Sequence, residues 1–81
     1  MKNIFYSFKN GDFPVPGSRV FIRLSEEAIQ EQDCPEAYVV SVETWQDGHL
    51  HFIEAAGEEY TEFHPKYIKD WCYLSELLKL N

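Results

Sequence analysis

Lysine and arginine are missing from the whole middle of this chain. Its 81 residues include 14 acids and 7 bases, which gives a formal net charge of −7. Eleven of the acids and none of the bases lie between Leu24 and Pro65. Nucleic-acid phosphates are bound by clustered cations, so direct nucleic-acid binding is not expected. A protein partner with a basic surface is electrostatically favoured, although acids also serve simply to keep a small protein soluble.

Long apolar runs are missing too. No stretch approaches the roughly 20 apolar residues that cross a bilayer, and the segment MKNIFYSFKNGDF has no apolar core of the kind found in signal peptides. Hydrophobic residues make up 44% and aromatic residues 16% of the chain, enough for a small core and too many for disorder. We therefore expect one cytoplasmic domain spanning 1–81, without membrane contact; the sequence leaves its oligomeric state open.

Catalytic motifs are scarce as well. Cys34 and Cys72 are the two cysteines, with no CxxC spacing, and we expect two free thiols rather than a disulfide in a reducing compartment. Cys72 follows Trp71 in an apolar run, which favours a buried, inert thiol. The chain has no P-loop, dinucleotide fingerprint or HExxH motif. These absences favour a protein that is not an enzyme and uses no cofactor.

What the sequence does contain is a β-hairpin signal over Tyr38–Ala56, YVVSVETWQDGHLHFIEAA. Two β-branched and aromatic runs flank one turn signal, Asp47–Gly48. A two-residue loop would pair Val42 with Ile53. A three-residue loop, Gln46–Gly48, with glycine in the left-handed conformation, would pair Val42 with Phe52 instead.

We favour the three-residue loop because of the side chains that it brings onto each face. It places an apolar set on one face (Tyr38, Val40, Val42, Leu50 and Phe52). It pairs Thr44 with Leu50 on that face, and it sets Glu43 opposite His51 and Ser41 opposite Ile53 on the more polar face. Trp45 then lies at the hairpin tip on the polar face.

Other elements flank this hairpin. Ile4–Phe8 alternates enough to predict a first strand, and Ser18–Leu24 predicts a second with Val20, Ile22 and Leu24 inward. The proline-containing segment Phe13–Gly17 is expected to be an extended lead-in. Glu26–Gln32 is either a two-turn helix with Ser25 as its N-cap or an acidic loop.

The C-terminal third is more ambiguous. Glu58–Phe63 predicts a short strand, and Pro65–Tyr67 a turn of 3₁₀ helix. Ile68–Leu80 fits either one helical stripe or a strand over Ile68–Leu74 followed by a short helix capped by Ser75. We favour the strand and short helix, largely because of the resemblance described next.

The order of these elements resembles an SH3-type small barrel, and Phe63–Ile68 (FHPKYI) is similar to the proline turn that precedes the last strand of such domains. The resemblance implies a mainly β fold, a small SH3-like barrel or a strongly bent antiparallel sheet of about five strands with one or two short helices. The chain has no ALYDY-like segment, and it has a lone Trp45 in place of paired tryptophans. Peptide binding is therefore not carried over.

A second resemblance covers roughly Phe13 to Leu77. The segments PGSRVF at Pro16–Phe21, WQDG at Trp45–Gly48 and IKDWCYL at Ile68–Leu74 are similar to a family of short phage and prophage proteins of unknown function. That family carries a Pro-x-x-Gly-x-x-Val opening, a Trp-x-x-Gly hairpin and a closing hydrophobic-x-x-Trp-x-x-Leu. The resemblance implies a small accessory protein of bacterial or mobile-element origin and implies no activity.

The histidines raise the question of a metal. His49 and His51 alternate on a strand and so share a face, with Glu43 opposite His51 as a third potential ligand. His64 would complete a zinc set only if the fold brings it near. Polar pairing of Glu43 with His51 is the more ordinary interpretation, so we predict no metal site and keep His49 and His51 as weak candidates.

We expect a non-enzymatic, acidic protein-binding module that engages a basic partner surface. The predicted contact residues are Trp45, Glu43, His49 and His51 at the hairpin, and Glu26, Glu27 and Glu31 in the acidic helix or loop. An exposed tryptophan among acids suits a binding hot spot, whereas the alternative is that Trp45 packs over Phe21. Two other functions remain open: a phage-encoded nucleic-acid mimic that inhibits a host defence or DNA-binding protein, and a metal or thiol enzyme using His49 and His51.

Overall fold

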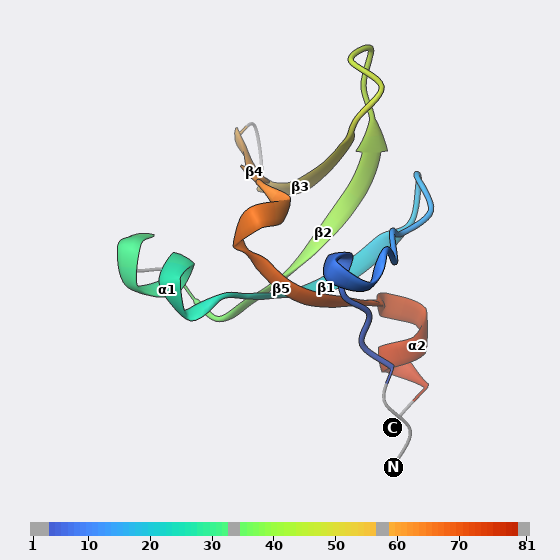
Figure 1. Ribbon diagram of the computed structural model, residues 1–81. Helices are drawn as coiled ribbons and strands as arrows, with labels where there is room; N and C mark the ends of the chain where they lie inside the picture. The colour runs from blue at the N-terminus through green and yellow to red at the C-terminus, as the bar shows by residue number, and fades with distance from the viewer. Residues whose placement is uncertain (1–3, 33–34, 57–58, 80–81) are drawn as a thin grey trace.

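The computed structural model describes residues 4–32, 35–56 and 59–79. It is mainly β, with five antiparallel strands in one sheet of order β4-β3-β2-β1-β5 (Figure 1). The strands are β1 (Arg19–Leu24), β2 (Ala37–Thr44), β3 (Leu50–Ala56), β4 (Glu59–Phe63) and β5 (Ile68–Tyr73). The sheet is strongly bent and open, with β4 and β5 at its edges, which is the second of the two expected forms.

In the part of the chain that the structure describes, four short helical segments connect or flank these strands. The α-helices are α1 (Glu26–Gln32) and α2 (Leu74–Leu78), and the 3₁₀ turns are η1 (Phe8–Asn10) and η2 (Pro65–Tyr67). Within the described residues, no helix is long and apolar enough to cross a membrane.

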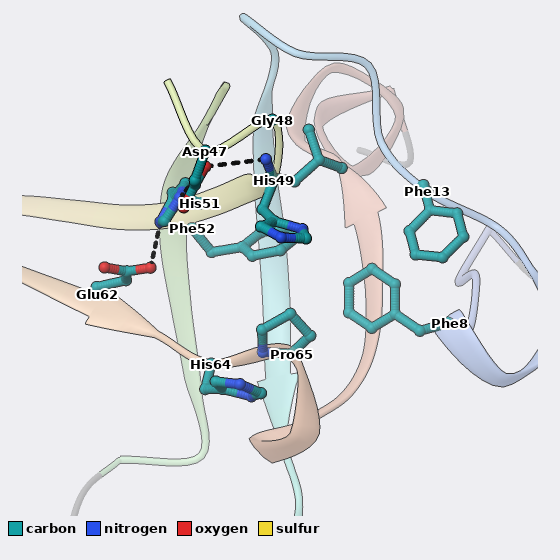
Figure 2. A pocket seen from close by; sticks show the side chains of 11 residues that line it. Phe8, Phe13, Asp47, Gly48, His49, His51, Phe52, Glu62, His64 and Pro65 are labelled. Atoms are coloured by element: carbon teal, nitrogen blue, oxygen red, sulfur yellow. Dashed lines mark hydrogen bonds and ion pairs between the residues drawn. The ribbon is translucent and has the colours of Figure 1, made fainter. Parts of the chain in front are cut away.

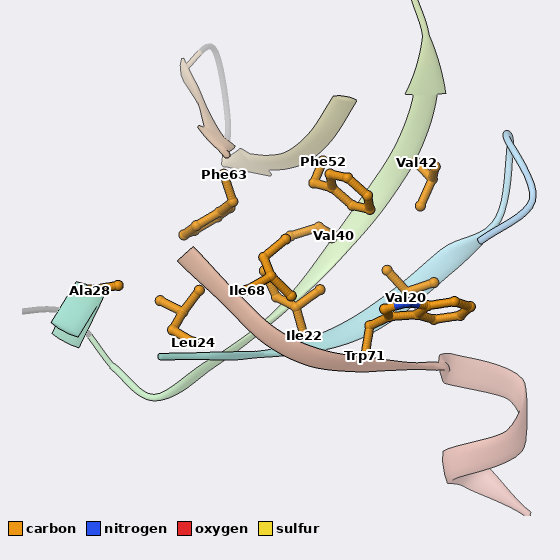
Figure 3. Close-up of a cluster of buried hydrophobic side chains, with 10 residues drawn as sticks. All are labelled: Val20, Ile22, Leu24, Ala28, Val40, Val42, Phe52, Phe63, Ile68 and Trp71. Atoms are coloured by element: carbon orange, nitrogen blue, oxygen red, sulfur yellow. The ribbon is translucent and has the colours of Figure 1, made fainter. Parts of the chain in front are cut away.

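The core lies inside the bend of the sheet. Figure 3 shows Phe63 from β4 and Ile68 from β5 facing one cluster from opposite sides. Ten buried side chains form it: Val20, Ile22, Leu24, Ala28, Val40, Val42, Phe52, Phe63, Ile68 and Trp71. Bending lets a single sheet bury one face against itself, which an 81-residue chain without a second layer needs.

The hairpin has the predicted register. Val42 pairs with Phe52, Thr44 with Leu50 and Glu43 with His51. The N–H of Gly48 donates to the carbonyl of Trp45 over 3.0 Å, and Gly48 has the positive φ of 78° that the predicted turn requires. The choice of the three-residue loop is therefore confirmed.

The acidic segment Glu26–Gln32 is a helix rather than a loop. The hydroxyl of Ser25 accepts from the N–H of Ala28 at 3.2 Å, so the predicted N-cap is confirmed. The methyl group of Ala28 is buried beside Leu24, while Glu26 and Glu27 remain exposed. Ala28, with partly buried Ile29 packed against the same cluster, thus ties an otherwise acidic helix to the core.

The predicted strand over Ile4–Phe8 is wrong. Only Tyr6 bridges β5, through two backbone hydrogen bonds with Trp71 of 2.7 and 3.0 Å. The hydroxyl of Ser7 accepts from the N–H of Lys9 and starts η1, which removes the following residues from the ladder. Phe8 then packs against the core, beside the ring of Phe52.

The C-terminal strand and short helix are confirmed, but the predicted cap is wrong. The helix α2 begins at Leu74, so its N-cap is Tyr73, which makes no side-chain capping bond. Tyr73 stays in the strand because it pairs with Val20 and its hydroxyl accepts from the N–H of Val15 at 3.1 Å. Ser75 therefore falls inside the helix, and tertiary contacts override the capping preference.

Candidate functional site

The candidate site is the tip of the β2–β3 hairpin together with the neighbouring part of β4. Trp45 lies where β2 ends, and 39% of its surface is exposed. Its ring stacks on the ring of His51, with centroids 3.7 Å apart and planes 12° from parallel. Phe21, the alternative partner, packs edge-to-face against Phe5 instead. The Trp45 side chain is therefore exposed and is also held in place by its stack on His51.

His51 is fixed by two carboxylates from different elements (Figure 2). Its Nδ1 lies 2.5 Å from Oε2 of Glu62 on β4, and its Nε2 lies 2.9 Å from Oδ2 of Asp47 in the turn. Only 12% of the His51 side chain is exposed, against 46% for Asp47 and 39% for Glu62. The imidazole thus links the turn, β3 and β4, and leaves both carboxylates accessible from solvent.

The predicted pairing of Glu43 with His51 is half right. The two residues are register partners on the same face, but the ring hydrogen bonds of His51 go to Glu62 and Asp47. Glu62 reaches the histidine because it pairs with Ile53, diagonally across from His51. Sequence reasoning missed Glu62, since nothing local shows how β4 aligns with β3.

The pKa values of Asp47 and His51 are both shifted in the direction that favours the ion pair between these two side chains. The N–H of His49 donates to Oδ1 of Asp47 at 2.9 Å, and this bond, with the His51 ring, lowers the pKa of Asp47. Burial alone would lower the pKa of His51, but its hydrogen bonds with Glu62 and Asp47 outweigh burial and raise it. Protonated His51 between two carboxylates is thereby favoured.

This geometry predicts a pH dependence. An unfolded histidine titrates near pH 6.5, about the ordinary value, and folded His51 titrates above it. The stability that these hydrogen bonds contribute is fully present below about pH 6.5 and is lost as the pH rises through the folded pKa.

NMR titration of the His51 ring should give a midpoint above that of the urea-unfolded chain. The Glu62→Gln variant should lower it; an unchanged midpoint would contradict the arrangement.

A cleft of about 660 Å³ opens beside this cluster (Figure 2). Phe8 and Phe13 form one wall, and His49, His51 and His64 all line the cleft. Nδ1 of His64 accepts from the N–H of Lys66 at 3.1 Å. Among the described residues, no group of three or more His, Cys, Asp or Glu side chains is arranged to hold a metal ion.

The remaining predicted residues divide between α1 and the hairpin. Glu26, Glu27 and Glu31 are exposed on α1, which lies near the start of β2 in Figure 1, whereas the hairpin tip lies beyond the end of that strand. Glu43 and His49 are exposed at the hairpin, with Glu43 on the face of the sheet that carries His51. The seven predicted contact residues therefore form two separate groups.

Cys72 is poorly suited to nucleophilic chemistry. Cys72 is free and fully buried, and its burial raises the pKa of the thiol, which disfavours the reactive thiolate. Cys34 lies outside the described residues.

Comparison of the chain with protein-family models, with curated proteins and with solved structures finds no match in any of the three. The resemblance to short phage and prophage proteins therefore stays a prediction.

Proposed function

We propose that this chain is a non-enzymatic, acidic binding module, a bacterial or phage accessory protein acting in the cytoplasm, that engages a basic surface of a partner protein through its hairpin tip. The observation that carries the proposal is the stack of exposed Trp45 on His51, with the carboxylates of Asp47 and Glu62 bonded to the same imidazole.

An arginine or lysine of a partner is the group best matched to this arrangement. A cation over the face of a tryptophan is attracted by the ring, and Asp47 and Glu62, which bond to the His51 ring of the same stack, add negative charge beside it. Because His51 and its hydrogen bonds already hold the Trp45 ring, binding would cost little side-chain entropy. Rings of this kind, central and ordered, dominate the binding energy of many interfaces.

Affinity capture with matched baits tests the proposal. Wild-type protein should retain a partner from an extract of its source cells, and the Trp45→Ala bait should lose it, with affinity reduced more than about tenfold. Tyr60→Ala is the control, because Tyr60 is an aromatic on β4 that is 63% exposed and absent from the stack. Retention should fall steeply as salt rises. Equal retention by the Trp45→Ala bait, or binding indifferent to salt, would contradict the proposal.

The nucleic-acid-mimic function places the contact on different residues. It assigns the binding surface to the acids of α1, so simultaneous reversal of Glu26, Glu27 and Glu31 to lysine would abolish capture in that case. Under the hairpin-tip proposal this triple variant loses only the long-range electrostatic contribution, which changes the association rate more than the dissociation rate.

A further inference from the structure

The cleft beside the hairpin tip owes its existence to the unequal lengths of two strands. The pairing of β3 with β4 ends at Phe52 and Phe63, whereas the pairing of β3 with β2 continues to Leu50. Beyond Phe63 the chain turns into η2 at Pro65, which cannot donate a ladder hydrogen bond. The start of β3 thus extends past β4, and a notch is left between the hairpin and η2.

Aromatic side chains from the N-terminal segment close the far side of this notch. The ring centroid of Phe8 lies 5.5 Å from that of Phe52 at the base of the notch and 5.6 Å from that of Phe13 at its rim. Phe13 is 62% exposed, although it belongs to this aromatic wall (Figure 2). An exposed ring that continues a buried row of rings is available to pack against a further apolar group.

The opposite rim is acidic. Asp47 and Glu62 line the cleft, and no lysine or arginine does so among the residues that the structure describes. Even when His51 carries a proton, the three charged groups of this rim sum to −1. The cleft therefore presents an apolar wall and a negative rim to the same occupant.

We infer that the cleft takes an extended segment of the partner protein, in which a bulky apolar side chain fills the notch and a neighbouring arginine or lysine meets Asp47 and Glu62. This inference rests on the proposed function and specifies which chemistry the partner presents. Charge complementarity selects a cationic residue. A cleft with a rim as exposed as Phe13 suits a chain that continues beyond it, since small-molecule sites enclose most of their ligand.

The hairpin stack and the cleft then act on adjacent parts of one segment. His51 belongs to both, because it stacks on Trp45 and also lines the cleft. The cation is placed at the shared carboxylates, and the apolar residue beside it is placed against Phe13. A partner surface with charge alone would use the stack and leave the cleft empty.

Synthetic octapeptides provide the probe. A series would combine tryptophan, leucine, proline or alanine at one position with arginine, glutamine or glutamate two residues later, and binding to the full chain would be measured by fluorescence anisotropy. Tryptophan or leucine together with arginine should bind best. Phe13→Ala and Glu62→Gln should each weaken that binding about tenfold or more.

Two control variants are matched to these changes. Val15 is as exposed as Phe13, at 62%, and lies outside the cleft, so Val15→Ala should leave binding unchanged. Glu59→Gln removes the same charge from β4 as Glu62→Gln, and Glu59 does not line the cleft. Equal losses from a variant and its control would overturn the inference.

The peptide series distinguishes a failure of the cleft inference from a failure of the proposed function. If arginine peptides bind regardless of their apolar residue, and binding falls with Trp45→Ala but not with Phe13→Ala, the cleft inference is overturned and the proposed function stands. If no arginine peptide binds better than its glutamate counterpart, both are overturned.

Discussion

Replacing Trp71 with alanine is expected to lower the free energy of unfolding by about 3–5 kcal/mol, which is a large part of the stability of a domain of this size. Trp71 is 1% exposed and belongs to the core cluster. Its ring stacks with Tyr6 at 4.8 Å and meets Tyr73 edge-to-face at 5.0 Å. Its Nε1–H donates to the carbonyl of Asp12, so truncation also leaves a part-buried acceptor unpaired.

Urea unfolding followed by circular dichroism measures this loss. The other tryptophan provides the control, because Trp45 is 39% exposed and lies outside the core cluster. The Trp45→Ala variant should lose no more than about 1 kcal/mol, as is usual for a partly exposed side chain. Similar losses for the two variants would mean that the core is not centred where the structure places it.

Introducing aspartate at Val42 is expected to prevent folding at neutral pH. Val42 is fully buried in the bend of the sheet, and no cation lies in the core cluster to pair with a carboxylate there. An unpaired buried charge costs several kcal/mol beyond the loss of the valine packing, which together exceed the stability of a small domain. The ¹H–¹⁵N NMR spectrum of Val42→Asp should collapse to the narrow dispersion of an unfolded chain.

The next residue provides the matched control. Glu43 is exposed on the other face of β2, so Glu43→Ala should keep a folded spectrum and change stability by about 0.5 kcal/mol or less. A dispersed native spectrum from Val42→Asp would contradict the assignment of the two faces, and with it the placement of Trp45 and Glu43 on the side away from the core.

The hairpin could be predicted from sequence because its determinants are local. Alternation fixes which residues share a face, and Gly48 supplies the one positive φ that the bulged turn requires. Together they gave the pairing of Val42 with Phe52, and hence a sided hairpin with Trp45 at its tip. The N-cap at Ser25 was predictable for the same reason.

What escaped prediction depends on contacts between distant segments. Tyr6 reaches β5 as a single bridge, and Tyr73 stays in its strand through a hydrogen bond from Val15, 58 positions away in the sequence. Glu62 joins His51 only after β4 has aligned with β3. No local pattern encodes these alignments, so the acid that completes the site could be found only in the folded chain.

The most direct test of the binding site follows the two indole N–H resonances of the protein during titration with its captured partner. The Trp45 indole reports on the hairpin tip and the Trp71 indole on the core, and both are followed in the same spectrum. The hairpin-tip account predicts that the Trp45 indole and the His51 ring shift most, while the Trp71 indole stays in place. Shifts confined to the amides of Glu26–Gln32, with the Trp45 indole unmoved, would contradict it.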